Sequence, residues 1–104
     1  MSVMIYGVDE ESKDFCCLAV ASERNFYDIW LPVIKKLDLK YVGDQHWLYR
    51  KDLPEILSEF QQLYEYSKKH NGLSNITMHS QHILEHLEAE WNKTAPNADR
   101  LWMG

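Results

Sequence analysis

The chain has 104 residues, of which 45% are hydrophobic and 26% are charged. This length supports one hydrophobic core and is too short for two, and the composition is typical of a folded globular protein and excludes a disordered one. Sixteen acidic residues against eleven Lys and Arg give a formal net charge of -5, so the long-range field disfavours nucleic acid and anionic lipid as partners and favours cationic surfaces.

Two apolar segments near the N-terminus, residues 3–8 and 14–21, are rich in β-branched and aromatic side chains and flank a short acidic stretch. They predict an antiparallel hairpin with an acidic loop. The only cysteines, Cys16 and Cys17, fall in the second segment, where adjacent side chains point to opposite faces of a strand. We therefore expect two buried, reduced thiols with no disulfide between them.

The next expected element is a helix over residues 23–37, in which apolar residues recur at helical spacing on two faces. Ser22 or Asn25 is a suitable cap for its start. Pro32 lies inside this helix and lacks a backbone N–H. We expect it to kink the helix or to split it into two pieces.

Residues 40–42 and 45–50, separated by Gly43-Asp44, predict a second hairpin or a strand with a bent start. The sequence Asp52-Leu53-Pro54-Glu55 then marks a helix start, because an acidic cap precedes a proline in the first turn. This second helix is expected to end near Lys69, directly before a glycine-containing segment.

Residues 75–92 predict a third helix, and residues 94–104 form a tail that either packs back on the domain or presents its aromatic residues to a partner. The predicted fold is a single α+β domain over residues 1–104. Its expected core is a small antiparallel sheet of about four strands packed against about three helices, in the chain order β-β-α-β-β-α-α.

The N-terminus has no basic segment ahead of an apolar run, and the longest apolar stretch, residues 15–21, is far shorter than a membrane span. We therefore expect a cytoplasmic protein that makes no contact with a membrane and no direct contact with nucleic acid.

One short motif points to metal chemistry. His82-Ile83-Leu84-Glu85-His86 matches the H-x-x-E-H signature of one class of zinc proteases. His79, His82 and His86 lie along one edge of a helical apolar stripe, and His82 and His86 are spaced to share a metal ion. A catalytic zinc needs a third protein ligand and a substrate cleft, and only eighteen residues follow His86. We expect no metal, no cofactor and no enzymatic activity, since the other catalytic motifs are missing from the sequence as well.

Acidic side chains gather in two parts of the sequence, the tip of the first predicted hairpin and the expected outer face of the second helix. The first group comprises Asp9, Glu10, Glu11 and Asp14, and the second comprises Glu55 and Glu59. Like charges four residues apart destabilise a helix slightly, so the second group either solvates the surface or contacts a partner. Trp47 and Trp102 are candidate aromatic anchors for such a partner, because a few buried aromatic residues commonly hold a complex that charge has helped to form.

Two stretches of the chain resemble a known group of proteins. Residues 25–39, which contain F-Y-x-x-W-L-P, and residues 51–60, which contain D-L-P-E, are similar to small bacterial immunity proteins encoded beside secreted polymorphic toxins, including those of contact-dependent growth inhibition. The likeness covers roughly residues 3 to 70. It implies a small cytoplasmic protein that neutralises one cognate toxin domain, commonly a nuclease, by covering its active site without catalysis.

We therefore expect an immunity protein that binds a basic nuclease or RNase domain through acids standing in for substrate phosphates. The residues expected at this interface are Asp9, Glu10, Glu11, Asp14, Asp44, Glu55 and Glu59, with Trp47 and Trp102 as anchors. Two alternatives stay open. The first is a non-catalytic adaptor or regulatory binding module, and the second is a metal-dependent hydrolase that uses His82, Glu85 and His86.

Overall fold

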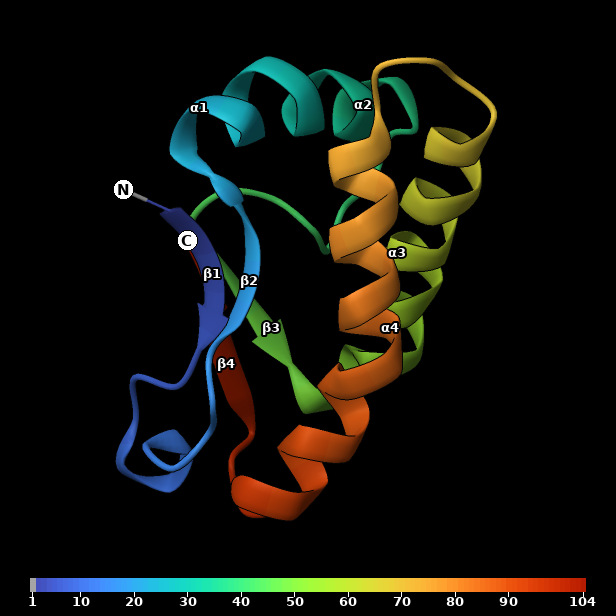
Figure 1. Cartoon of the computed structure of the whole chain (residues 1–104). Coiled ribbons are helices and arrows are strands. Elements are labelled where there is room, and N and C mark those ends of the chain that lie inside the picture. Colours follow the sequence, from blue (N-terminus) through green and yellow to red (C-terminus); the bar gives the residue numbers. More distant parts are fainter. Residues whose placement is uncertain (1) are drawn as a thin grey trace.

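The computed structural model describes residues 2–104 and contains one four-stranded antiparallel sheet with helices on one of its faces (Figure 1). The strands lie side by side in the order β2-β1-β4-β3. Their bounds are Ser2–Tyr6 for β1, Leu18–Ser22 for β2, His46–Tyr49 for β3 and Arg100–Met103 for β4. The predicted α+β class, with about four strands and three helices, is confirmed.

The first helical stretch is continuous over residues 23–36 and crosses one end of the sheet (Figure 1). It consists of α1 (Glu23–Asn25), a π-helical segment (Phe26–Trp30) and α2 (Leu31–Lys36). Ser22 caps it by accepting a hydrogen bond from the Asn25 N–H at 3.2 Å. The interruption expected at Pro32 takes the form of a π-helical segment that ends at Trp30, two residues before the proline. This wider turn relieves the clash that a proline ring makes with the carbonyl four residues earlier in an α-helix.

The other two helices, α3 (Leu53–Lys68) and α4 (Ser74–Thr94), pack against each other and against the sheet (Figure 1). Both begin and end close to the predicted residues, because their apolar residues recur strongly at helical spacing. The core between helices and sheet contains Ile5, Val20, Phe26, Trp30, Leu48, Ile56, Phe60, Leu63, Ile83, Leu87, Trp91 and Leu101, all fully buried. Among the helices over residues 2–104, none combines the length and the apolar character that a membrane span requires.

The order of strands along the chain differs from the prediction. Residues 40–42 form no strand, and the fourth strand is instead β4, formed by the C-terminal tail. β4 lies between β1 and β3, with Met103 opposite Ile5 and Leu101 opposite Leu48. The observed order is therefore β-β-α-β-α-α-β, and the tail packs back into the centre of the sheet.

A side chain holds residues 40–42 in place of strand pairing. Glu59 on α3 is only 8% exposed, and its Oε1 accepts hydrogen bonds from the backbone N–H groups of Tyr41 and Val42 at 2.8 and 3.0 Å. Its Oε2 accepts one from the Lys40 N–H at 2.8 Å. The prediction that Glu59 lies on the outer face of its helix is therefore wrong, because the loop folds over this carboxylate to satisfy its own backbone donors.

The first hairpin forms as predicted, but its strands are shorter and its loop is longer. Leu18 pairs with Ile5, so residues 7–17 form the connection and include a single 3-10 turn. Cys16 and Cys17 belong to this connection and are both exposed. The expectation of buried thiols is wrong, because β2 begins only at Leu18 and the loop buries Phe15 in place of the cysteines.

Candidate functional site

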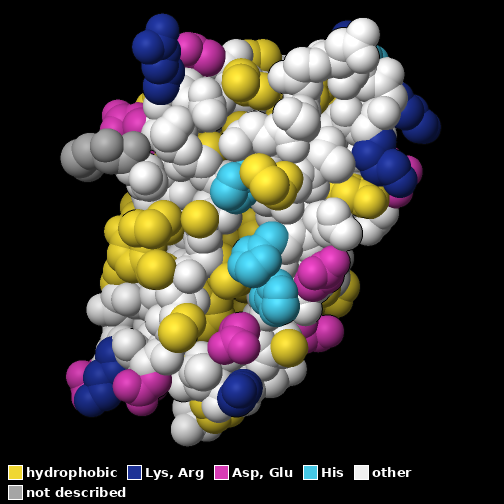
Figure 2. Space-filling view, viewed as in Figure 1, with side chains coloured by type: hydrophobic (Ala, Val, Ile, Leu, Met, Phe, Trp, Pro, Cys, Tyr) yellow, Lys and Arg dark blue, Asp and Glu magenta, His cyan; other side chains and the backbone are white. Residues whose placement is uncertain are grey.

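In the part of the chain that the structure describes, residues 2–104, one face of the sheet carries no helix. Figure 1 shows α3 and α4 on the opposite side, and burial along β4 agrees with this arrangement. Leu101 and Met103 are fully buried toward the helices, whereas Arg100 and Trp102 alternate with them and are half-buried. Hydrophobic side chains are visible over β1 on the side of the sheet away from α4 (Figure 2).

Strand register brings four aromatic residues together on this open face. Tyr6 and Trp47 both lie opposite Trp102, and Tyr49 lies opposite Arg100. The Trp47 and Trp102 rings meet edge to face, with centroids 4.8 Å apart, and the Arg100 guanidinium carbon lies 3.7 Å from the Trp47 ring centroid. We call Tyr6, Trp47, Tyr49 and Trp102 the aromatic face.

The two tryptophans of the aromatic face differ from the other two in their indole N–H groups. Trp30 and Trp91 are fully buried, and each donates its indole N–H to a protein oxygen, at 2.9 and 3.0 Å. Within residues 2–104, the indole N–H groups of Trp47 and Trp102 donate to no protein oxygen. Every buried side-chain N or O atom in these residues has a hydrogen-bond partner, so an N–H without one is not buried. Both N–H groups therefore reach solvent, where a bound partner can accept from them.

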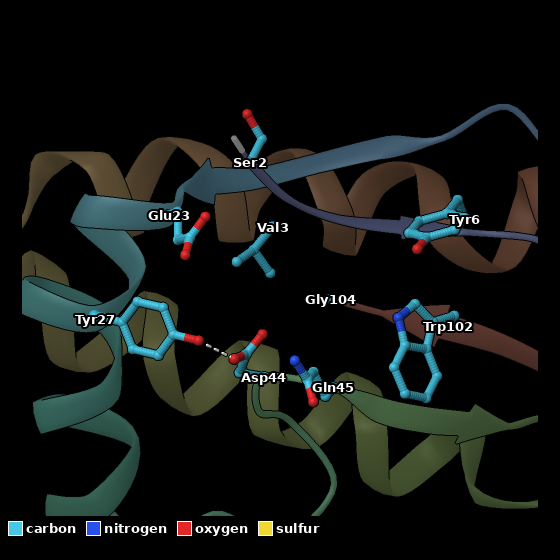
Figure 3. Close-up of a pocket in the computed structure, with 9 residues that line it drawn as sticks. All are labelled: Ser2, Val3, Tyr6, Glu23, Tyr27, Asp44, Gln45, Trp102 and Gly104. Carbon is cyan, nitrogen blue, oxygen red and sulfur yellow. Dashed lines mark hydrogen bonds between the residues drawn. The ribbon is translucent and has the colours of Figure 1, made fainter.

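A pocket of about 270 Å³ adjoins the aromatic face at the end of the sheet crossed by α1. We call it the Asp44 pocket. Figure 3 shows Tyr6 and Trp102 on one side of it and Glu23 and Tyr27 on the other, with the Asp44 side chain between them. Among the described residues 2–104, no lysine or arginine lines this pocket.

The Asp44 pocket has a negative field. The Tyr27 hydroxyl donates a hydrogen bond to the Asp44 carboxylate. This bond raises the pKa of Tyr27 above its ordinary value, and burial and the charges of Asp44 and Glu23 raise it further. The turn that presents Asp44 continues into Gln45, whose φ of 57° lies in the left-handed region that a side chain of this length rarely adopts.

A second pocket, of about 330 Å³, lies beside Tyr49 and Arg100. We call it the Asp9 pocket, since Asp9, Glu11 and Asp99 supply its acids. Arg100 donates to the two carboxylate oxygens of Asp9 at 2.8 and 3.4 Å. The hydrogen bond and the charge of Arg100 hold the pKa of Asp9 below its ordinary value, and the bond to Asp9 raises the pKa of Arg100.

The remaining acids proposed from the sequence lie outside these two pockets. Glu10 is exposed and pairs with Lys13 at 2.8 Å, and Asp14 is exposed on the same loop. Glu55 is exposed on α3 and lines neither pocket. Glu59 is buried under the 40–42 loop, so it is unable to contact a partner.

The histidines of α4 lie in a row on its surface (Figure 2). The ring centroids of His82 and His86 are 4.4 Å apart, and the His86 Nε2 lies 3.9 Å from the Glu85 carboxylate. Across residues 2–104, no three metal-binding side chains gather in a group that would hold an ion.

The sequence patterns do not indicate several residues of the site, namely Tyr6, Glu23, Tyr27, Tyr49, Asp99 and Arg100. A signal for part of this set was present, because Arg100-Leu101-Trp102-Met103 alternates as a half-buried strand does. Reading it as a strand predicts that Arg100 and Trp102 share a face. Which strands pair with it, and hence which other aromatic residues join that face, depends on contacts distant in the sequence.

Comparisons with known protein families, with curated proteins and with solved structures find no match to this chain.

Proposed function

We propose that this protein is a cytoplasmic immunity protein that binds a cognate toxin domain, a basic nuclease or RNase, and blocks its active site. One observation carries the proposal: the open face of the sheet holds a Trp47–Trp102 pair between two acid-lined pockets. Aromatic residues with unused indole N–H groups at the centre and carboxylates at the rim are the features of a surface that binds a cationic protein.

The carboxylates of the two pockets, at the rim of the aromatic face, are complementary to the active site of a nuclease. An active site that binds nucleic acid is lined with cations that contact phosphates. Glu11 and Asp99 at one end of the aromatic face, and Glu23 and Asp44 at the other, present carboxylates to such cations. The net charge of -5 adds long-range attraction, which raises the association rate.

The pair formed by Asp9 and Arg100 has a different part in the proposed surface. Its charges balance each other, and it holds the guanidinium against Trp47. We infer that this pair orients the tryptophan before the partner arrives, which reduces the entropy that binding removes from the side chain.

The test is co-expression with the C-terminal domain of the protein encoded immediately upstream. We expect that domain to stop growth when expressed alone, to be tolerated together with this protein, and to co-purify with it in a stoichiometric complex. No toxicity and no complex would refute the proposal and would leave the adaptor interpretation in its place.

Matched variants locate the surface in the same assay. Trp102→Ala should weaken the complex by about 30-fold or more, the size of an anchor residue's contribution. Met78→Ala, which removes a side chain 62% exposed on α4, should leave binding unchanged. Glu11→Lys should slow association at low salt, whereas Glu65→Lys, the same change on the exposed surface of α3, should have a much smaller effect. Equal effects of the site and control variants would place the interface elsewhere.

A further inference from the structure

We propose that the Asp44 pocket receives the side chain of one arginine of the partner protein. This inference rests on the proposed function and assigns the kind of residue that the pocket recognises. It is argued from the charge of the pocket, from its size and walls, and from a matching arrangement elsewhere on the same face of the sheet.

The negative charge of the pocket favours a cationic ligand. Glu23 and Asp44 reach it from separate elements, α1 and the turn before β3. The nearest basic residue in sequence, Arg24, does not line the pocket and pairs with Asp28 at 3.7 Å. Only the Tyr27 hydroxyl donates to Asp44 within residues 2–104, and it occupies one of the two carboxylate oxygens. The other oxygen and the Glu23 carboxylate remain to accept from a ligand.

The size and the walls of the pocket suit one amino-acid side chain. Its volume of about 270 Å³ lies just below the range of about 300 to 1,000 Å³ that is usual for pockets that bind whole small molecules. Tyr6, Tyr27 and Trp102 line it (Figure 3). Aromatic rings attract cations, and a planar guanidinium stacks on them while its N–H groups bind carboxylates in a fork, which a lysine ammonium does not do.

The same protein already shows this arrangement at the other end of the aromatic face. There, Arg100 stacks on Trp47 at 3.7 Å and donates to both oxygens of Asp9. Trp102 and Asp44 both line the Asp44 pocket and offer the same two kinds of group, an indole ring and a carboxylate, with Gln45 between them in Figure 3. Among residues 2–104, no arginine lines this pocket. An arginine from the partner would complete the second arrangement.

The first measurement is the affinity of the full-length protein for the toxin domain. Asp44→Asn and Glu23→Gln each remove one charge and keep the shape of the side chain. We expect each to weaken the complex by about 10-fold or more, mainly through faster dissociation, because the partner's guanidinium loses a carboxylate. Glu65→Gln, the same change on the exposed surface of α3 and outside the proposed binding surface, should alter dissociation by less than about threefold. The Glu23 side chain is exposed and makes no hydrogen bond to another residue within 2–104, so Glu23→Gln keeps the test valid if Asp44→Asn fails to fold.

The second measurement needs no toxin. N-acetyl-arginine methylamide, added at millimolar concentration to isotope-labelled protein, should shift the NMR signals of the Trp102 indole N–H and the Gln45 amide. The neutral citrulline analogue should not shift them, and the arginine effect should disappear in Asp44→Asn. A complex that forms as well with Asp44→Asn and Glu23→Gln as with the Glu65→Gln control, together with no arginine-specific shift, would overturn this inference and leave the proposed function standing. An arginine-specific shift without any toxin complex would refute the proposed function and support the pocket.

Discussion

The buried Glu59 carboxylate makes the sharpest prediction about stability. It accepts three backbone N–H groups of the 40–42 loop at 2.8 to 3.0 Å. Glu59→Ala leaves these donors without acceptors, and the Val42 N–H lies in a residue that is only 1% exposed. A buried donor without a partner costs about 1 to 3 kcal/mol, whereas a donor that water can reach costs much less.

We count the full cost of an unpaired buried donor for the Val42 N–H and part of that cost for the Lys40 and Tyr41 N–H groups. Glu59→Ala should then reduce the free energy of unfolding by about 3 to 4 kcal/mol. For a domain of this size, that corresponds to a decrease in Tm of about 15 °C. Glu59→Gln should lose less, about 2 kcal/mol, because its amide oxygen can still accept from Tyr41 and Val42 while its NH2 group faces the Lys40 N–H.

Thermal and urea unfolding followed by circular dichroism measure these changes. Glu55→Ala is the matched control, one helical turn earlier and exposed, and it should cost at most about 1 kcal/mol, the value of an acid in the first turn of a helix. Amide hydrogen exchange should also lose protection at residues 41 and 42 in Glu59→Ala. If the alanine variants at 55 and 59 were equally stable, the carboxylate would not be holding the loop.

Three further predictions concern other parts of the chain. Asp38 follows α2 with a φ of 54°, a left-handed conformation that glycine adopts without strain. Asp38→Gly should therefore stabilise the protein by about 0.5 to 1 kcal/mol in urea unfolding, and a loss of stability would contradict this account of the helix end. The pKa of Asp9 is lowered in the fold, so its pairing with Arg100 stabilises the protein above about pH 4 and is lost as the pH falls further; the Tm of Asp9→Asn should lie below that of the wild type at pH 7 and approach it at pH 3, and a constant difference would contradict this. Both cysteines are exposed, so both should react with a thiol reagent in the native protein as fast as in urea, and protection of either would place it in the interior.

The elements with strong periodicity could be predicted from the sequence, and those that depend on distant contacts could not. The apolar residues of α3 and α4 recur at helical spacing over many turns. This pattern predicts both helices and places their ends within two residues of the observed ones. β4 has only four residues, and its partners β1 and β3 lie far away in the sequence. Nothing within residues 94–104 indicates that this tail occupies the centre of a sheet.

The candidate site was predictable to a similar degree. The sequence suggests Trp47 and Trp102 as separate anchors, and the structure brings them into contact. The burial of Glu59 can be inferred from helical spacing, because Glu59 lies three residues after Ile56 and four before Leu63, both fully buried. Its chemical character suggested the surface, and the helical spacing, which places it on the buried face, was the better guide.

The central position of β4 links the core to the proposed binding surface. Along this one strand, Leu101 and Met103 are buried against the helices, whereas Arg100 and Trp102 lie on the open face. A shift of one residue in its register would exchange the two sets. The pairing of β4 with β1 and β3 therefore determines both how the core closes and which side chains a partner meets. Deleting the strand would remove both at once, whereas a single substitution at Trp102 changes the surface and leaves the buried face intact.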